Sequence, residues 1–225
     1  MLLSDRLTHL WPAAGISARA GDLELRWIDD ELLVDLVGLA SRGVHDPGQL
    51  PFTTLWTQGT ELEVARRFLA YQWSVREKVG PDTFMLELAV LRDGVPVGVQ
   101  AVSGDDWAIL RSVETGSWLG KEFHGRGIGT RMRALMLHVC FEGLGAAEVT
   151  STAYEDNPAS NAVSRRVGYE PDGVNRVVRD RKPEILKRYR MTRERWERVQ
   201  GTNSKLIGVP VELIGFEEFR EHLDG

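Results

Sequence analysis

A glycine-rich run is the part of the sequence whose residue types point most directly to chemistry. Its members are His124, Gly125, Arg126, Gly127, Ile128, Gly129 and Thr130. The run lies between an expected strand and a strong helix pattern. The first backbone N–H groups of a helix have no partner inside the helix, and together with the helix dipole they attract anions. The run therefore predicts a phosphate-binding turn.

Two common phosphate-binding motifs do not fit this run. The P-loop ends in Gly-Lys followed by Ser or Thr, and the dinucleotide fingerprint needs another glycine spacing with an acidic residue after the next strand. A tight turn without any ligand uses the same glycines, because glycine adopts backbone conformations that other residues avoid. The run alone leaves both an anion site and a purely structural turn open.

Two further segments place the glycine-rich run in a wider pattern. Gly116-Ser117-Trp118-Leu119-Gly120 precedes it, and Asn157-Pro158-Ala159-Ser160-Asn161 follows it, ahead of Gly168-Tyr169. Together these segments resemble the GNAT superfamily of acyl-CoA N-acyltransferases, in particular its RimJ/RimL-like branch. The resemblance spans about residues 23–192 and is strongest over 114–169.

The resemblance implies a specific ligand for the glycine-rich run, the pyrophosphate of coenzyme A. The superfamily motif is Gln/Arg-x-x-Gly-x-Gly/Ala, and here His124 stands at the first position while Gly127 and Gly129 match. The superfamily uses mainly backbone amides from this loop, so pyrophosphate binding is expected to survive, with His124 or Arg126 adding a cation. The pantetheine arm is implied to lie between the fourth and fifth strands, against Ser117, Trp118 and Leu119.

The resemblance also implies how the leaving thiolate is handled. Many members carry a general-acid Tyr seven residues after the Asn that matches Asn157, but here Ser164 occupies that place. In the RimL-like pattern a Ser at the position of Ser160 protonates or hydrogen-bonds the thiolate instead. A Ser near the start of a helix also caps the helix, so Ser160 has a structural alternative. We expect Asn157 and Ser164 to border the cofactor.

An amine acceptor needs a base before it can attack a thioester. The pKa is about 10.4 for Lys and about 8 for an α-amino group, so the amine is protonated near neutral pH. Glu114 is the first candidate, because it precedes Gly116 on the strand expected beside the thioester, and Glu87 on a neighbouring strand is the second. Glu114 also has a simple explanation as an exposed strand residue or ion-pair partner.

The hydrophobic pattern predicts the elements that position these residues. Strands are expected from Leu23, over 83–91, 96–103, 109–119 and 148–153, from Tyr169, and over 185–192. Helices are expected over about 30–40, 61–78, 130–139 and 158–167. The strand-helix-strand unit over 118–153 requires two parallel strands. The predicted fold class is therefore α/β (α+β mixed sheet), mostly antiparallel. The resemblance further implies a GNAT-like arrangement, with the fourth and fifth strands splayed and helices flanking the sheet.

The chain is expected to hold one principal domain with an extension at each end. We predict an N-terminal extension over 1–22, an acyltransferase domain over 23–192, and a C-terminal extension over 193–225 that packs on the domain. The C-terminal segment is predicted to add a short strand and a short helix.

The composition limits the kinds of protein to which the chain can belong. Its 225 residues are 42% hydrophobic and carry a net charge of -5, which suits a folded domain and argues against nucleic acid as the main partner. The sequence has neither an apolar run near the about 20 residues of a membrane span nor a secretion signal, so a cytoplasmic protein is expected. The lone Cys140 predicts neither a disulfide nor a metal site.

The sequence thus predicts an enzyme that moves an acetyl or other short acyl group from acyl-CoA to a primary amine. The acceptor is a small molecule or a protein or peptide N-terminus, and succinyl transfer stays open beside acetyl transfer. The alternative is a non-catalytic acyl-CoA-binding module, because the general-acid Tyr is missing at position 164. A nucleotide-binding regulatory domain is a third reading. The oligomeric state, a homodimer included, is left open.

Overall fold

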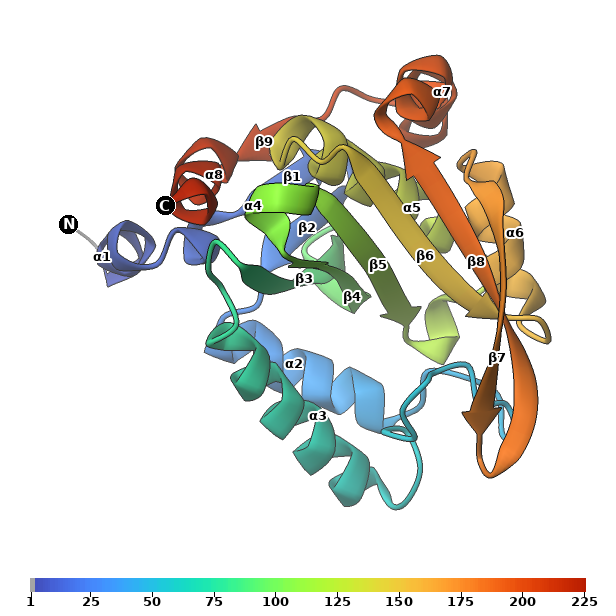
Figure 1. Ribbon diagram of the computed structural model, residues 1–225. Coiled ribbons are helices and arrows are strands. Elements are labelled where there is room, and N and C mark those ends of the chain that lie inside the picture. Colours follow the sequence, from blue (N-terminus) through green and yellow to red (C-terminus); the bar gives the residue numbers. More distant parts are fainter. Residues whose placement is uncertain (1–2) are drawn as a thin grey trace.

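The protein is described over residues 3–225 by a computed structural model (Figure 1). Its strands form one nine-stranded sheet within these residues, in the order β7-β8-β6-β5-β4-β3-β2-β1-β9. The strands are β1 Ser17–Ala20, β2 Leu23–Trp27, β3 Thr83–Arg92, β4 Val95–Asp105, β5 Ser112–Leu119, β6 Glu148–Tyr154, β7 Glu170–Arg179, β8 Lys182–Thr192 and β9 Glu212–Ile214. The α-helices are α1 Leu3–Leu10, α2 Asp30–Ser41, α3 Glu61–Arg76, α4 Trp107–Leu110, α5 Ile128–His138, α6 Pro158–Arg166, α7 Arg193–Ile207 and α8 Phe216–Asp224.

The pairing of the strands confirms the predicted mixed sheet. Among the described strands, β5 and β6 run parallel and all other neighbours run antiparallel. Parallel neighbours need a long crossover, and the connection that contains α5 supplies it. Counted from the first predicted strand at Leu23, the fourth and fifth strands are β5 and β6, the two that part in Figure 1.

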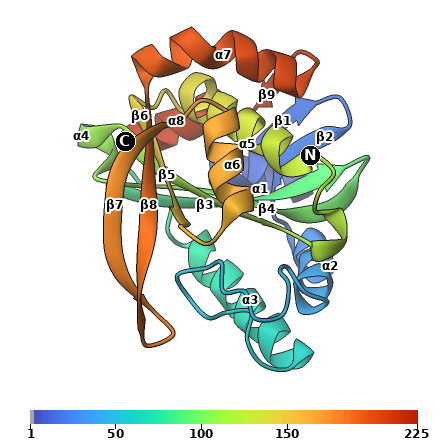
Figure 2. The same ribbon diagram turned by 90° about the vertical axis from the view of Figure 1, so that its right-hand side faces the viewer.

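Helices cover both faces of the sheet and enclose two apolar cores. α2 and α3 lie on one face, and α5 and α7 lie on the other (Figure 2). Successive side chains of a strand point to opposite faces. Accordingly Trp118 of β5 packs with Leu36 and Phe68 in the α2/α3 core, while Leu119 joins Trp196 in the core on the other face. Burial on both faces thus fixes which side chains near the end of β5 point toward α2 and α3 and which point toward α5 and α7.

Polar residues at helix starts determine where α2 and α3 begin. The Asp29 carboxylate accepts a hydrogen bond from the Leu32 backbone N–H at 2.8 Å, as expected for an N-cap. Thr60 and Glu63 form a reciprocal capping box at the start of α3. Because these caps are local in sequence, both predicted helix starts are confirmed.

One local prediction is wrong, and two elements near the N-terminus were not predicted. The strand expected over 109–119 starts only at Ser112, because Trp107–Leu110 forms the short helix α4 and Asp106 and Arg111 on either side take positive φ. The first 21 residues contain α1 and β1, which were not expected. β1 has the sequence Ser-Ala-Arg-Ala, whose small side chains give almost no hydrophobic alternation.

Both chain ends contribute to the sheet. β1 pairs with β2, and β9 pairs with β1 at the sheet edge. The strand and helix predicted for the C-terminal segment are found as β9 and α8, and the longer helix α7 precedes them. The boundaries 1–22, 23–192 and 193–225 stay a proposal about domain organisation.

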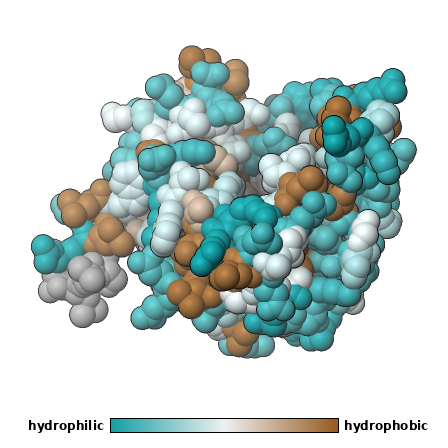
Figure 3. All heavy atoms as spheres, turned by 90° about the horizontal axis from the view of Figure 1, so that it is seen from below, coloured by the Kyte–Doolittle hydropathy of each residue, from teal (hydrophilic) through white to brown (hydrophobic). Residues whose placement is uncertain are grey.

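The outer surface on the α2 and α3 side carries its apolar side chains in separate clusters (Figure 3). None of the helices within residues 3–225 is both long enough and apolar enough to cross a membrane. Figure 3 views the molecule from the α2 and α3 side and shows apolar side chains in several separate clusters among hydrophilic ones. Leu62 and Trp73 of α3 are among the exposed apolar residues, at 57% and 56% exposure.

Candidate active site

The separation of β5 from β6 is the feature around which the candidate residues gather. Ladder pairing between the two strands runs from Ser112 opposite Glu148 to Thr115 opposite Ser151, and among the described residues it goes no further. Both strands nevertheless continue, to Leu119 in β5 and to Tyr154 in β6. Beyond Thr115 and Ser151, the ladders in the described part of the chain pair β5 with β4 and β6 with β8, and not with each other. Backbone edges on both sides of the gap are therefore free to pair with an extended ligand.

The glycine-rich run forms the turn at the open end of this gap. Gly125 and Gly127 have φ of +71° and +76°, the left-handed region that other residues enter at a cost. Neither glycine would crowd a neighbour if it carried a Cβ, so backbone conformation alone accounts for both. Gly127 is the N-cap of α5 and provides no side-chain cap. The first amides of α5, those of Ile128, Gly129 and Thr130, are thus left for an anion.

The two cationic side chains of the turn are placed differently. The His124 ring Nε2 lies 3.1 Å from the Leu119 carbonyl oxygen, which ties the turn to the end of β5. Arg126 is exposed, with its guanidinium carbon 5.8 Å from the centre of the Phe123 ring. The structure thus gives His124 an anchoring contact and leaves Arg126 facing solvent.

The side chains of the segment expected to hold pantetheine are occupied with fixing β5. Trp118 packs edge-to-face on Phe68 with ring centres 5.5 Å apart, and Leu119 is 8% exposed in the core on the α5 side. The Ser117 hydroxyl accepts a hydrogen bond of 3.0 Å from Arg133. These contacts hold the strand rigid, so its backbone edge is what it offers to a ligand.

The two candidate bases lie on the α2/α3 face of the sheet, at different distances from the gap. Glu114 is exposed, and its Oε1 accepts a hydrogen bond of 3.2 Å from the Thr152 hydroxyl, which reaches across from β6. Glu87 stands opposite Ala101 of β4, which stands opposite Gly116, so Glu87 is two strands or about 10 Å from β5.

The environment of Glu87 differs from that of Glu114. The Tyr71 hydroxyl donates to Glu87 Oε1 at 2.9 Å, and the Gln72 amide donates to Oε2 at 3.3 Å. Burial raises the pKa of Glu87 above its ordinary value, against the opposing effect of these two hydrogen bonds. Both oxygens of Glu87 are engaged by α3, whereas Glu114 faces the gap.

The start of α6 contains the residues expected beside the thioester. Asn157 is the N-cap, and its Oδ1 accepts a hydrogen bond of 3.1 Å from the Ser160 backbone N–H. Within residues 3–225 the Ser160 hydroxyl has no hydrogen-bond partner, so the alternative that it caps the helix is not supported. Ser164 is buried and donates to the Ser160 carbonyl at 3.2 Å, which makes it a packing residue of α6.

Three buried polar residues beside the gap were given no individual role from the sequence. Asn161 donates from Nδ2 to the carbonyl oxygens of Tyr154 and Asn157 and accepts from the Tyr189 hydroxyl at 2.6 Å, which fixes α6 on the end of β6. The others are Arg133 and Tyr169. The sequence feature that could have pointed to Arg133 is an arginine inside the apolar stretch of a helix.

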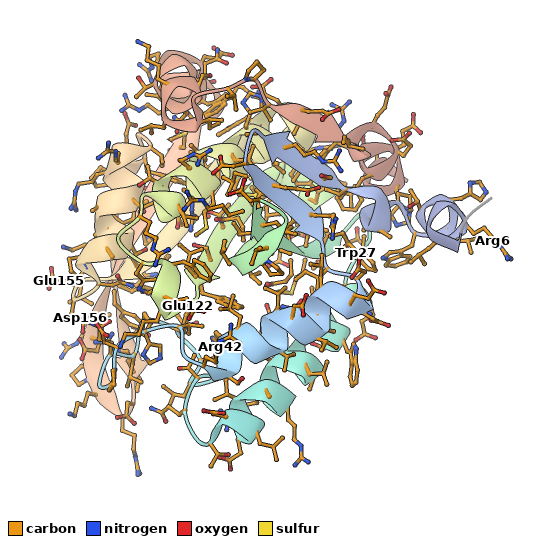
Figure 4. All side chains as sticks on the ribbon, turned by 180° about the vertical axis from the view of Figure 1, so that it is seen from behind. Arg6, Trp27, Arg42, Glu122, Glu155 and Asp156 are labelled. Carbon is orange, nitrogen blue, oxygen red and sulfur yellow. The ribbon has the colours of Figure 1, made fainter. Side chains whose placement is uncertain are left out.

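The long connection between α2 and α3 is fastened next to the gap. Arg179 of β7 donates to the Leu50 carbonyl at 3.0 Å and pairs with Asp156 at 2.5 Å, while its guanidinium lies 4.1 Å from the centre of the Tyr154 ring. Arg179 holds the pKa of Asp156 below its ordinary value. Figure 4 shows Glu155 and Asp156 at this corner, and Arg42 facing Glu122 at the other end of the connection.

Comparison with known proteins identifies the family. The acetyltransferase (GNAT) domain family matches residues 22–170. The chain belongs to the GNAT acetyltransferase family. The Bacillus subtilis (strain 168) protein named putative ribosomal N-acetyltransferase YdaF is 33% identical over 91 residues, which are 40% of this chain and 49% of YdaF. The match thus spans about half the length of that relative.

Solved structures of the GNAT family share the fold. Mycobacterium smegmatis RimJ, solved with CoA-disulfide, has a TM-score of 0.69 at 20% identity, covering 88% of this chain and 94% of RimJ. A GCN5-related N-acetyltransferase from Brucella melitensis has a TM-score of 0.68 at 18% identity, covering 91% and 94%. RimL, a ribosomal L7/L12 α-N-protein acetyltransferase solved with coenzyme A, has a TM-score of 0.58 at 20% identity, covering 76% and 94%. The GNAT fold and family expected from the sequence are confirmed.

Proposed function

We propose that the protein transfers an acetyl or other short acyl group from acyl-CoA to a primary amine. One observation carries the proposal. At the end of β5, the N-terminus of α5 has no side-chain cap, and it lies next to the edges of β5 and β6 that have no ladder partner. The helix N-terminus suits an anionic pyrophosphate, and the strand edges suit an extended pantetheine arm that carries amide groups. RimJ and RimL of the GNAT family were solved with forms of coenzyme A, which supports this choice of ligand.

The donor is assigned to the residues of the turn and of β5. The backbone amides of Gly127, Ile128, Gly129 and Thr130 hold the pyrophosphate, with Arg126 adding charge. The backbone of Ser117, Trp118 and Leu119 pairs with the pantetheine arm along the β5 edge. Gly125 allows the turn its tight course, and His124 braces it on β5.

The reaction is a direct attack of the amine on the thioester. Glu114, directly or through water, takes a proton from the ammonium form of the acceptor. The amine nitrogen then bonds to the carbonyl carbon and the carbon–sulfur bond breaks. Ser160 donates its hydroxyl proton to the departing thiolate and takes up the second proton that the nitrogen releases, so coenzyme A leaves as the thiol and the product is the neutral amide. A backbone N–H of β5 stabilises the negative charge on the carbonyl oxygen. Asn157 positions Ser160 by capping the helix that carries it.

The acceptor is assigned to the α2/α3 face, where Glu114 is exposed. The connection over 42–60, fastened by Arg179 and Asp156, borders this face. RimL is named as an acetyltransferase of a protein α-amino group, and YdaF as a putative ribosomal one. These names favour a protein or peptide N-terminus as acceptor over a small amine. The net charge of -5 favours a cationic acceptor in either case.

Turnover with a panel of amines tests the proposal. The protein is incubated with acetyl-CoA and peptides or small amines, and free thiol is followed over time. We expect thiol release that depends on the amine, and a kcat at least about tenfold lower in Ser160→Ala. Ser204→Ala is the matched control, because Ser204 is an exposed helical serine on α7 and its loss should leave the rate unchanged.

Two other results would change the proposal. Tight binding of coenzyme A without turnover across the panel would favour the non-catalytic acyl-CoA-binding module. Equal rates for the wild type and for Ser160→Ala would remove the assigned role of Ser160 while leaving the acyl transfer itself in place.

A further inference from the structure

Arg133 is a buried arginine on the face of α5 that packs against the sheet. Arg133 as a whole residue is only 6% exposed. Its Nη1 donates to the Ser151 hydroxyl at 3.2 Å, to the Thr115 carbonyl at 3.3 Å and to the Thr115 hydroxyl, and its Nη2 donates to the Ser117 hydroxyl at 3.0 Å. All of these partners are neutral.

The positive charge of Arg133 has no counter-charge in the described part of the chain. No carboxylate among residues 3–225 lies within ion-pair distance of its guanidinium, and its Nε is buried without a hydrogen-bond partner. Arg131, two residues earlier on the same helix, pairs with both oxygens of Asp22, at 2.5 and 3.1 Å. Burying an unpaired charge is costly, so the environment of Arg133 suits an anionic ligand better than it suits the free protein.

Arg133 lies at the closed end of the gap between β5 and β6. Thr115 and Ser151 are the last ladder pair of the two strands, and Ser117 is beyond it on β5. The glycine-rich turn lies at the opposite, open end, next to Leu119. A donor whose pyrophosphate is held at the turn and whose arm runs along β5 therefore carries its acyl group toward the closed end.

We propose that Arg133 forms a carboxylate subsite for the acyl group, so that the enzyme prefers donors whose acyl chain ends in a carboxylate. This inference rests on the proposed acyl transfer. The carboxylate of a dicarboxylic acyl chain pairs with the guanidinium by charge-assisted hydrogen bonds, and the hydroxyls of Thr115, Ser117 and Ser151 hold the guanidinium in place. The bond changes are those of the proposed reaction, and the far carboxylate is unchanged in the product.

Donor preference tests this subsite. Succinyl-CoA and butyryl-CoA have acyl chains of equal length and differ in the terminal carboxylate. We expect the wild type to use succinyl-CoA with a kcat/KM at least about tenfold above that for butyryl-CoA, as one charge-assisted contact would give. Arg133→Gln keeps a hydrogen-bonding side chain and removes the charge. It should lose the preference for succinyl-CoA while its kcat/KM for butyryl-CoA changes by less than about threefold.

A matched control separates the subsite from a structural role. Arg131→Gln removes an arginine of the same helix whose charge is already balanced by Asp22, and it should keep the wild-type donor preference. Equal use of the two donors by the wild type would overturn the inference, and so would an equal loss of both donors in Arg133→Gln, which is the result of a purely structural link between β5 and β6. Arg133→Lys keeps the charge and should keep part of the preference if Arg133→Gln does not fold.

Binding of free coenzyme A distinguishes failure of the proposed acyl transfer from failure of the subsite at Arg133. Calorimetry that detects no coenzyme A binding to the wild type would contradict the proposed function itself. Binding of coenzyme A and acetylation of an amine, without any preference for succinyl-CoA over butyryl-CoA, would contradict only the subsite at Arg133.

Discussion

At the scale of single residues, the proposed chemistry depends on a carboxylate beside the gap. Glu114 is exposed and receives a hydrogen bond from Thr152 across the gap. Glu114→Gln should lower kcat by about 100-fold or more, because a general base contributes about that much, while the Kd for acyl-CoA stays unchanged. Steady-state kinetics and calorimetry measure the two effects. Glu212→Gln, an exposed strand glutamate on the edge strand β9, is the control and should behave as wild type.

The raised pKa of Glu87 predicts how stability depends on pH. A carboxyl whose pKa is higher in the folded state binds its proton more tightly there, so the free energy of unfolding falls as pH rises from the ordinary value of about 4.5 through the folded pKa. Glu87→Gln cannot ionise and should remove this decline. Melting temperatures of both proteins between acidic and neutral pH measure it. The same decline in both proteins would show that Glu87 is not its source.

Single residues also mark the limit of what the sequence could predict at the site. The glycines of the turn and the cap at Asn157 act through neighbouring backbone, so their positions follow from sequence spacing. Arg133 acts through contacts with β5 and β6, which pairing brings together from distant parts of the chain. The one local sign of Arg133, an arginine inside the apolar stretch of a helix, does not identify these distant partners.

At the scale of elements, the start of α5 requires a residue that tolerates positive φ. Gly127→Ala should lower the free energy of unfolding by about 1–2 kcal/mol, because an L-residue is strained in the left-handed region. It should also weaken coenzyme A binding, since the same residue positions the first amides of the helix. Gly201→Ala, in the middle of α7 where a Cβ has open space, should instead stabilise by about 0.5–1 kcal/mol. Chemical denaturation measures both.

Elements were predictable from the sequence where a local signal is strong. The caps at Asp29 and Thr60 give the starts of α2 and α3. α7 was missed because its apolar residues are few and its sequence is rich in charge, although the buried Trp196 anchors it on the core. The edge strand β1 was missed because its neighbours β2 and β9, and not its own pattern, make it a strand.

At the scale of the whole molecule, the C-terminal segment is part of the main core. Phe219 of α8 is fully buried and its ring centre lies 6.2 Å from that of Phe84 on β3. Phe219→Ala should therefore lower the free energy of unfolding by about 3–5 kcal/mol. Val95→Ala, at a site 56% exposed, should change it by less than about 0.5 kcal/mol. Equal, small effects in urea denaturation would mean that α8 is dispensable for the core.

The gap between β5 and β6 is a property of the whole sheet. It exists because β5 is held by β4 on one side and β6 by β8 on the other, while α5 and the connection between α2 and α3 occupy the two faces. The separation of the fourth and fifth strands was predicted only through the family resemblance, since pairing between distant segments has no local signature. The anion-binding amides at the start of α5 and the gap between β5 and β6 come together only in the folded molecule.

Calorimetric titration of the wild type with coenzyme A, and separately with ATP, shows whether the turn and the gap together bind an acyl-CoA donor. The turn at Gly127 and the gap beside Ser117 together predict saturable binding of coenzyme A, because its pyrophosphate and its pantetheine arm both find partners. ATP offers phosphates but no arm for the gap, so its binding should be much weaker. Binding of ATP without binding of coenzyme A, or binding of neither, would rule out acyl-CoA as the ligand of this site.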